Sequence, residues 1–191
     1  MAKKIWVYVD HFKGETSAAA WEGFKVAADL AKEVEGVVSA IVIGDSVNTL
    51  TESAYGYGAS QVFVLDNSAV LDYVPETYAS AISAKVKEET PDIILFPTST
   101  RGRELSAIVG VDLSAGVMPD VTEILVDDGG FVASRPIYAG KLTAKVKSVS
   151  AIQIFTLRAR AFGKPEFSEG KSGETVLMEL PNIDGSTKVV D

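Results

Sequence analysis

The feature that most constrains the fold is a regular alternation of short apolar runs with stretches of helical periodicity. Residues 5–9 form a β-branched and aromatic run, and residues 37–43 are apolar at nearly every position. A strand that is apolar throughout is typical of a sheet covered by helices on both faces. Similar short runs occupy residues 61–65 and 93–96. These four segments therefore predict four buried strands.

Helical patterns fill the intervals between these runs. Residues 20–34 have apolar side chains at helical spacing, and Gly36 stands where a C-cap glycine belongs. Further helices are predicted over residues 47–57, from Pro75 to a point before Pro91, and over residues 103–113. A strand–helix pair repeated about four times predicts an α/β fold of the Rossmann-like, doubly wound type. Its mostly parallel sheet would carry helices on both faces.

The pattern changes after Pro119, where strands are no longer separated by helices. Residues 121–126 and 131–137 flank an Asp-Asp-Gly-Gly turn and predict an antiparallel hairpin. Two further strands are predicted over residues 142–149 and 151–157. The second half is thus a β-rich, antiparallel extension that either widens the sheet or forms a flap on it.

Beyond Phe162 the composition becomes rich in Gly, Ser, Glu, Lys and Pro, which is typical of a linker. One short strand is predicted within it, over residues 176–180. We therefore place the folded core at residues 1–162 and an extension or linker at residues 163–191.

Composition and charge exclude several classes of function. Hydrophobic residues make up 47% and charged residues 23% of the chain, as in folded globular proteins. The net charge of −8 repels nucleic acid and anionic membranes. No apolar run reaches the length of a membrane span, and the start passes at once into a strand, so we expect a cytoplasmic protein without direct membrane insertion. With no cysteine and one histidine, we expect no metal site.

The first candidate site is the turn after the fourth predicted strand, which contains Thr98, Ser99, Thr100 and Arg101 and opens a helix. In such sheets ligands gather beyond the carboxyl ends of the strands, and a helix N-terminus attracts anions. With Arg103 nearby, this edge would suit a nucleotide phosphate, another anion or a partner's carboxylate. The alternative is an ordinary N-cap with surface arginines.

Asp10, His11 and Lys13 follow the first predicted strand near the same edge. A histidine there could act in proton transfer, but the favoured interpretation is a solvent-exposed loop residue. Several glutamates are expected on solvated helix surfaces or ends, so no paired acid and base is predicted. They are Glu15, Glu22, Glu33, Glu35, Glu88 and Glu89.

Four segments, taken in order, resemble the alpha subunit of electron transfer flavoproteins. They are Thr-Ser-Thr-Arg-Gly-Arg-Glu (98–104), Pro-Asp-Val-Thr (119–122), Ser-Arg-Pro-Ile-Tyr-Ala-Gly (134–140) and Thr-Leu-Arg-Ala-Arg-Ala-Phe (156–162). The resemblance covers about residues 5–162. It implies an electron-carrier subunit, not a catalyst, that pairs with a beta subunit and passes electrons from flavin dehydrogenases to a quinone reductase or another acceptor.

In that family a carboxy-terminal domain of the alpha subunit carries most contacts to FAD. The resemblance therefore implies FAD in the complete protein and none bound by this chain alone, with the present residues forming a scaffold. It also points to residues 134–149 as a surface for the beta subunit, with Arg135, Tyr138, Lys141, Lys145 and Lys147 mixing basic and aromatic groups. An ordinary exposed sheet face is the alternative.

A second function of another class shares this architecture. A regulatory module of the universal-stress-protein type would bind ATP or AMP at the Thr98 edge. The spacing of Gly102, Gly110 and Gly116 does not match the phosphate loop of that type. The single histidine also makes a nucleophile–base pair of a hydrolase a poor fit.

Overall fold

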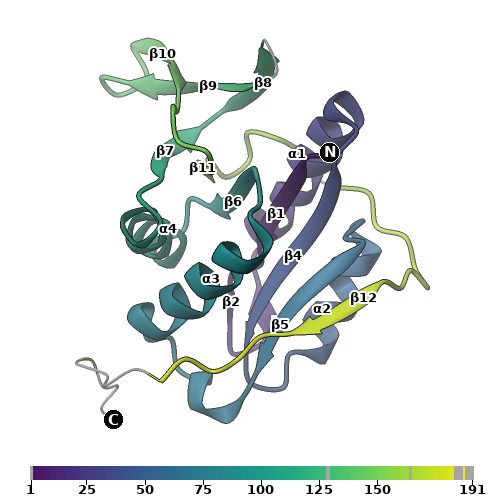
Figure 1. Cartoon of the computed structure of the whole chain (residues 1–191). Helices are drawn as coiled ribbons and strands as arrows, with labels where there is room; N and C mark the ends of the chain where they lie inside the picture. Colours follow the sequence, from purple (N-terminus) through teal and green to yellow (C-terminus); the bar gives the residue numbers. More distant parts are fainter. Residues whose placement is uncertain (1, 128–129, 164, 183–186, 188–191) are drawn as a thin grey trace.

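The computed structural model describes residues 2–127, 130–163, 165–182 and 187 (Figure 1). The elements along these residues are β1 (Lys4–Tyr8), β2 (His11–Phe12), β3 (Glu15–Thr16), α1 (Ala18–Val34), β4 (Val37–Gly44), α2 (Asn48–Gly56), β5 (Gln61–Asp66), the short 3-10 helix η1 (Ser68–Val70), α3 (Pro75–Glu89), β6 (Ile93–Pro97), α4 (Thr100–Asp112), β7 (Gly116–Val121), β8 (Glu123–Asp127), β9 (Gly130–Ile137), β10 (Leu142–Lys147), β11 (Gln153–Leu157) and β12 (Glu174–Leu177). None of the helices among these residues is both long enough and apolar enough to cross a bilayer.

A seven-stranded sheet with the order β12-β5-β4-β1-β6-β11-β7 forms the centre of the molecule. Every ladder in it is parallel. The chain builds β1, β4 and β5 in one direction and then returns to place β6 on the other side of β1, so the strand order reverses between β1 and β6. The predicted doubly wound α/β fold is confirmed.

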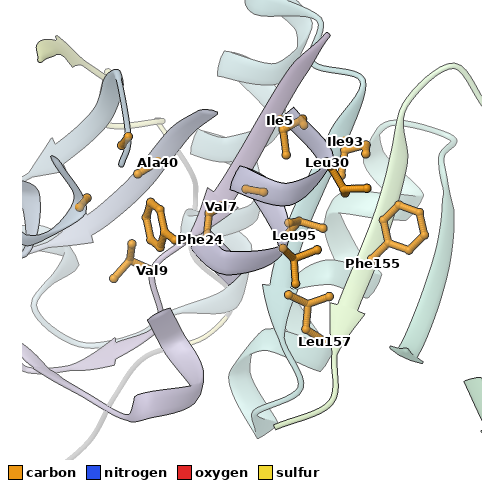
Figure 2. Close-up of a cluster of buried hydrophobic side chains, with 14 of the residues drawn as sticks. Ile5, Val7, Val9, Phe24, Leu30, Ala40, Ile93, Leu95, Phe155 and Leu157 are labelled. Atoms are coloured by element: carbon orange, nitrogen blue, oxygen red, sulfur yellow. The ribbon is translucent and has the colours of Figure 1, made fainter. Parts of the chain in front are cut away.

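Helices cover the two faces of this sheet, and each face has its own apolar core. Successive residues of β1 point to opposite faces of the sheet. Val7 lies in the core under α1, and Trp6 lies in the core under α3 and α4. Figure 2 shows the first core, where Phe24 and Leu30 of α1 lie among strand residues such as Val7 and Phe155. Strands buried on both faces explain why their sequences are apolar almost throughout.

The end of α1 differs from the prediction that Gly36 caps it. Glu35 is the C-cap residue and adopts the left-handed conformation, with φ of 51°. Gly36 is needed for a different reason, because a Cβ at this position would lie 2.8 Å from the carbonyl oxygen of Lys3. The glycine thus permits close approach of two backbone segments.

The β-rich second half both widens the sheet and forms a separate layer. β8, β9 and β10 make a three-stranded antiparallel sheet, and the predicted hairpin is confirmed by the β8–β9 pairing. Its turn residues, 128–129, lie outside the described residues. β11 and β7 instead join the main sheet.

Strand β7 was not predicted, because it contains Pro119. A proline lacks the N–H that a central strand must donate, and it is found in strands mainly at sheet edges. β7 is the last strand of its sheet, and at such an edge a missing donor is tolerated.

The segment beyond residue 162 adds strand β12 to the opposite edge of the main sheet. β12 pairs in parallel with β5, from Glu174 opposite Gln61 to Leu177 opposite Val64. Before it, Phe167 packs on the ring of Tyr57, and the chain crosses from β11, which lies next to the edge strand β7, to the opposite edge of the sheet (Figure 1). The main sheet therefore includes residues on both sides of residue 162. That residues 163–191 lead to a flavin-binding domain stays a prediction.

Candidate functional site

The turn from Thr98 to Arg101 lies at the carboxyl end of β6, beside the carboxyl end of β1. These two strand ends flank the point at which the strand order reverses. In open α/β sheets such a reversal separates the two neighbouring loops and is where ligands are held. The hydroxyl-rich turn and Asp10 therefore lie at one location in space, although they are far apart in sequence.

The hydroxyl groups of Thr98 and Ser99 in this turn form hydrogen bonds within the protein. Ser99 is the N-cap residue of α4, and its Oγ accepts a hydrogen bond of 2.9 Å from the backbone N–H of Gly102. Thr98 Oγ1 donates to Thr156 Oγ1 of β11 at 2.9 Å. Thr100 begins α4 and is exposed. For Ser99 the N-cap alternative thus describes what the side chain does.

Arg101 reaches across the reversal point to Asp10. Its Nε lies 3.1 Å from Asp10 Oδ1, and the two side chains are 26% and 8% exposed. The guanidinium group also lies over the rings of Phe12 and Tyr73, 5.5 Å and 6.0 Å from their centroids. The expectation of a surface arginine is therefore wrong for Arg101, whose charge is compensated by a nearly buried carboxylate.

Tyr73 and Tyr78 pack edge to face beside this ion pair. Burial raises the pKa of Tyr78 to about 12, and its hydroxyl donates to the carbonyl of Val70 at 2.8 Å. Burial is also the main reason that the pKa of Tyr73 is raised. Both phenols are neutral near pH 7, so neither supplies an ionised base at this edge.

His11 is not the solvent-exposed loop residue that was expected. It belongs to the short strand β2, and its Nε2 lies 2.7 Å from the carbonyl oxygen of Ile43 at the end of β4. The backbone N–H of Gly14 donates to Nδ1 at 3.1 Å, so Nε2 carries the proton. With both ring nitrogens engaged, His11 joins β2 to the main sheet. Lys13 pairs with Asp72 on the surface.

The half-buried position of His11 predicts an acid-sensitive contribution to stability. Burial lowers the pKa of His11 in the folded state, outweighing its hydrogen bond to Ile43 and the charge of Asp10, which raise it. The unfolded chain thus binds the proton first. Stability should be complete above the unfolded pKa of about 6.5 and decline as the pH falls towards the folded pKa.

The measurement is the urea midpoint between roughly pH 7 and pH 5 for the wild type and for His11→Gln, whose amide can still donate to Ile43. The wild type is expected to lose more stability over this interval than the variant. Equal losses in the two proteins would show that other groups cause the acid sensitivity.

Glu22 was predicted on a solvated helix face, and this is wrong. The residue is 7% exposed, and both carboxylate oxygens lie 2.9 Å from the backbone N of Arg160. The hydrogen bonds from the backbone N–H of Arg160 to this carboxylate join α1 to the loop after β11. A signal was present, because Val26 and Leu30 follow Glu22 at helical spacing on a buried face.

Sequence reasoning also missed a cluster at the carboxyl ends of β7 and β11. Arg158 donates to the carboxylate of Asp120 through Nε at 3.0 Å and Nη2 at 2.5 Å. Both residues lie in segments that carry the family resemblance, but no local pattern indicates that they pair, because they are separated by 38 residues.

The chain is similar to known proteins over nearly its whole length. A family model described as the electron transfer flavoprotein domain matches residues 5–182. The chain is 29% identical to the protein FixB of Azorhizobium caulinodans over 95% of its own length and 51% of the relative's. It is 33% identical to the electron transfer flavoprotein subunit alpha of Thermoanaerobacterium thermosaccharolyticum, over 76% of this chain and 44% of the relative. It is 30% identical to the electron transfer flavoprotein subunit alpha of Megasphaera elsdenii, over 99% of this chain and 57% of the relative. The chain thus spans about half the length of these relatives.

Proposed function

Since the chain belongs to the electron transfer flavoprotein family, we propose that it is the amino-terminal domain of an alpha subunit and serves as a scaffold in an electron carrier. The observation that carries this proposal is the match of nearly the whole fold to about half of relatives named as that subunit. In this role the domain itself catalyses no reaction. A beta subunit pairs with it, and the complete protein holds FAD.

The edge at the strand reversal supports a scaffold more than a nucleotide-binding module. A nucleotide there would need open polar groups, yet Arg101 is paired with Asp10 and the Ser99 hydroxyl caps α4. An ATP- or AMP-binding regulatory module is therefore not favoured by the geometry. The comparisons, which return electron transfer flavoproteins, favour the scaffold as well.

Strands β9 and β10, with the residues that follow them up to Val149, form the surface that we assign to the beta subunit. Residues 130–149 contain four basic residues and no acidic one, whereas the rest of the chain contains fourteen basic and twenty-six acidic residues. Such segregated charge favours a partner with an acidic surface. Strands β9 and β10 lie at one end of the molecule (Figure 1), and Phe131 and Ala133 of β9 pack into the core under α1.

The tip of the β9–β10 hairpin adds an apolar anchor to this surface. Tyr138 is 75% exposed and Leu142 is 56% exposed, and both line a hollow together with Ala139 and Lys141. Tyr138 and Ala139 both have a positive φ, of 50° and 53°, a conformation that costs free energy in residues other than glycine. A strained backbone that displays an aromatic ring is consistent with a contact residue.

The test is binding of the chain to a beta subunit from the same source, measured by equilibrium ultracentrifugation. Tyr138→Ala is expected to weaken binding about 30-fold, because a central aromatic anchor contributes roughly 2 kcal/mol. Val149→Ala is the matched control, since Val149 is a fully exposed apolar residue of the same basic region. Its effect should stay below about threefold.

The possible outcomes separate the two parts of the proposal. Even weak specific complexes form at protein concentrations of tens of micromolar. If no complex forms in this range, the proposed pairing is wrong. A complex that Tyr138→Ala and Val149→Ala weaken equally would leave the pairing intact and refute the hairpin tip as its anchor.

A further inference from the structure

Asp120 occupies a position that several strand ends share. It lies near the end of β7 with a positive φ of 59°, and its backbone N–H donates to Thr156 Oγ1 of β11 at 2.9 Å. The same threonine oxygen accepts from Thr98 at the end of β6. The carboxylate of Asp120 is therefore held in place at the carboxyl ends of three neighbouring strands, where Arg158 binds it with two hydrogen bonds.

Two more arginines lie beside this carboxylate. The backbone N–H of Thr122 donates to the carbonyl of Ser134 at 2.9 Å, which brings Arg135 next to the segment that follows Asp120. Arg103 lies in the first turn of α4, directly after the strand end that holds Thr98. The hydrogen bonds from Arg158 lower the pKa of Asp120 against the opposing effect of burial, and the charges of Arg103 and Arg135 lower it further. We name Arg103, Asp120, Arg135 and Arg158 the arginine cluster.

Positive charge exceeds negative charge in the arginine cluster. Within the part of the chain that the structure describes, Asp120 forms an ion pair with Arg158, whereas Arg103 and Arg135 form none. In the same part of the chain, Nε of Arg135 is buried without a hydrogen-bond partner. A buried donor in that state costs free energy that an acceptor from outside the chain would recover.

We propose that the arginine cluster is a binding site for an oxyanion, a carboxylate or phosphate group, held by Arg103, Arg135 and Arg158. Guanidinium groups present paired N–H donors that match the oxygens of either anion. Asp120 fixes Arg158 in position and at the same time competes with the ligand for its charge. This site is separate from the Asp10–Arg101 pair, and it does not depend on the function proposed above.

The experiment follows the Nε–Hε signals of the arginines by NMR in the ¹⁵N-labelled 191-residue chain. Sodium acetate and sodium phosphate are titrated separately, with chloride used to keep the ionic strength constant. We expect saturable shifts of the Arg135 and Arg158 signals with a dissociation constant on the order of millimolar. The anion that saturates at the lower concentration identifies the preferred ligand chemistry. If neither anion gives saturable shifts, the proposal is wrong.

Arg135→Gln tests the residue with the buried donor. It is expected to weaken anion binding about tenfold, the loss that corresponds to one charged hydrogen bond. The matched control is Lys145→Gln, which removes an exposed charge from the same small sheet and should change binding less than about twofold. Equal weakening in both variants would mean that the anion senses only the general basic field, which contradicts a defined site.

Asp120→Asn provides a test in the opposite direction. The amide has the shape of the carboxylate but no charge, and the backbone bond to Thr156 does not depend on the side chain. Removing the competing negative charge should tighten anion binding about tenfold, an increase that a purely structural ion pair would not produce. Unchanged or weaker binding in this variant would overturn the proposal.

Discussion

The 191-residue chain is expected to retain no stoichiometric FAD after incubation with excess cofactor and desalting. A bound flavin needs a cleft with polar groups that converge on its phosphates and ring. At the strand reversal, where this fold would provide one, Arg101 and Asp10 are paired and flanked by Phe12 and Tyr73. The measurement is the visible absorption spectrum of the desalted protein.

A longer alpha chain with its carboxy-terminal domain, combined with a beta subunit, is the positive control and should retain flavin under the same treatment. In that complex, Asp10→Asn and His11→Gln should leave the flavin content nearly unchanged. A stoichiometric flavin band in the 191-residue chain would refute the scaffold role. It would also place the cofactor at the edge formed by Asp10 and Thr98.

Gly102→Ala is expected to destabilise the domain by about 2–4 kcal/mol, the sum of overpacking and a lost N-cap. A Cβ at Gly102 would lie 2.1 Å from the carbonyl oxygen of Pro97 and 3.0 Å from Ser99 Oγ. The first contact involves backbone at the end of β6, which cannot rotate away. The first turn of α4 must therefore shift, and this shift would break the hydrogen bond between Gly102 and Ser99.

Gly110→Ala is the matched control within the same helix. Its nearest contact, at 2.5 Å, is a methyl group of the Val117 side chain, which can move more easily than backbone. Alanine also has a helix propensity about 1 kcal/mol better than glycine, which offsets part of the strain. Urea unfolding should therefore show a clearly smaller loss for this variant. Similar losses for both variants would show that the approach of Gly102 to Pro97 has no special importance.

Most of the secondary structure could be predicted from the sequence, because its patterns are local. The apolar run of residues 37–43 and the helical spacing around Phe24 each depend on residues within a few positions of one another. β7 was missed because Pro119 obscures the strand pattern, and its position at a sheet edge is a property of the whole sheet. The helical spacing of Glu22 with Val26 and Leu30 indicated its buried face, but its role as an acceptor depends on Arg160, a residue 138 positions away.

The sequence by itself determined the α/β class, the order of the elements, the family resemblance and the edge of the sheet at which polar residues gather. Only the tertiary structure decided which of these residues are free to bind. The parallel sheet brings Arg101 to Asp10 across 91 positions, and it brings Arg158 to Asp120. Each of the four members of the arginine cluster comes from a different one of the four segments that resemble electron transfer flavoprotein alpha subunits. The physical reason is that charge pairing depends on distance in space, which strand order sets and which no local pattern of residues encodes.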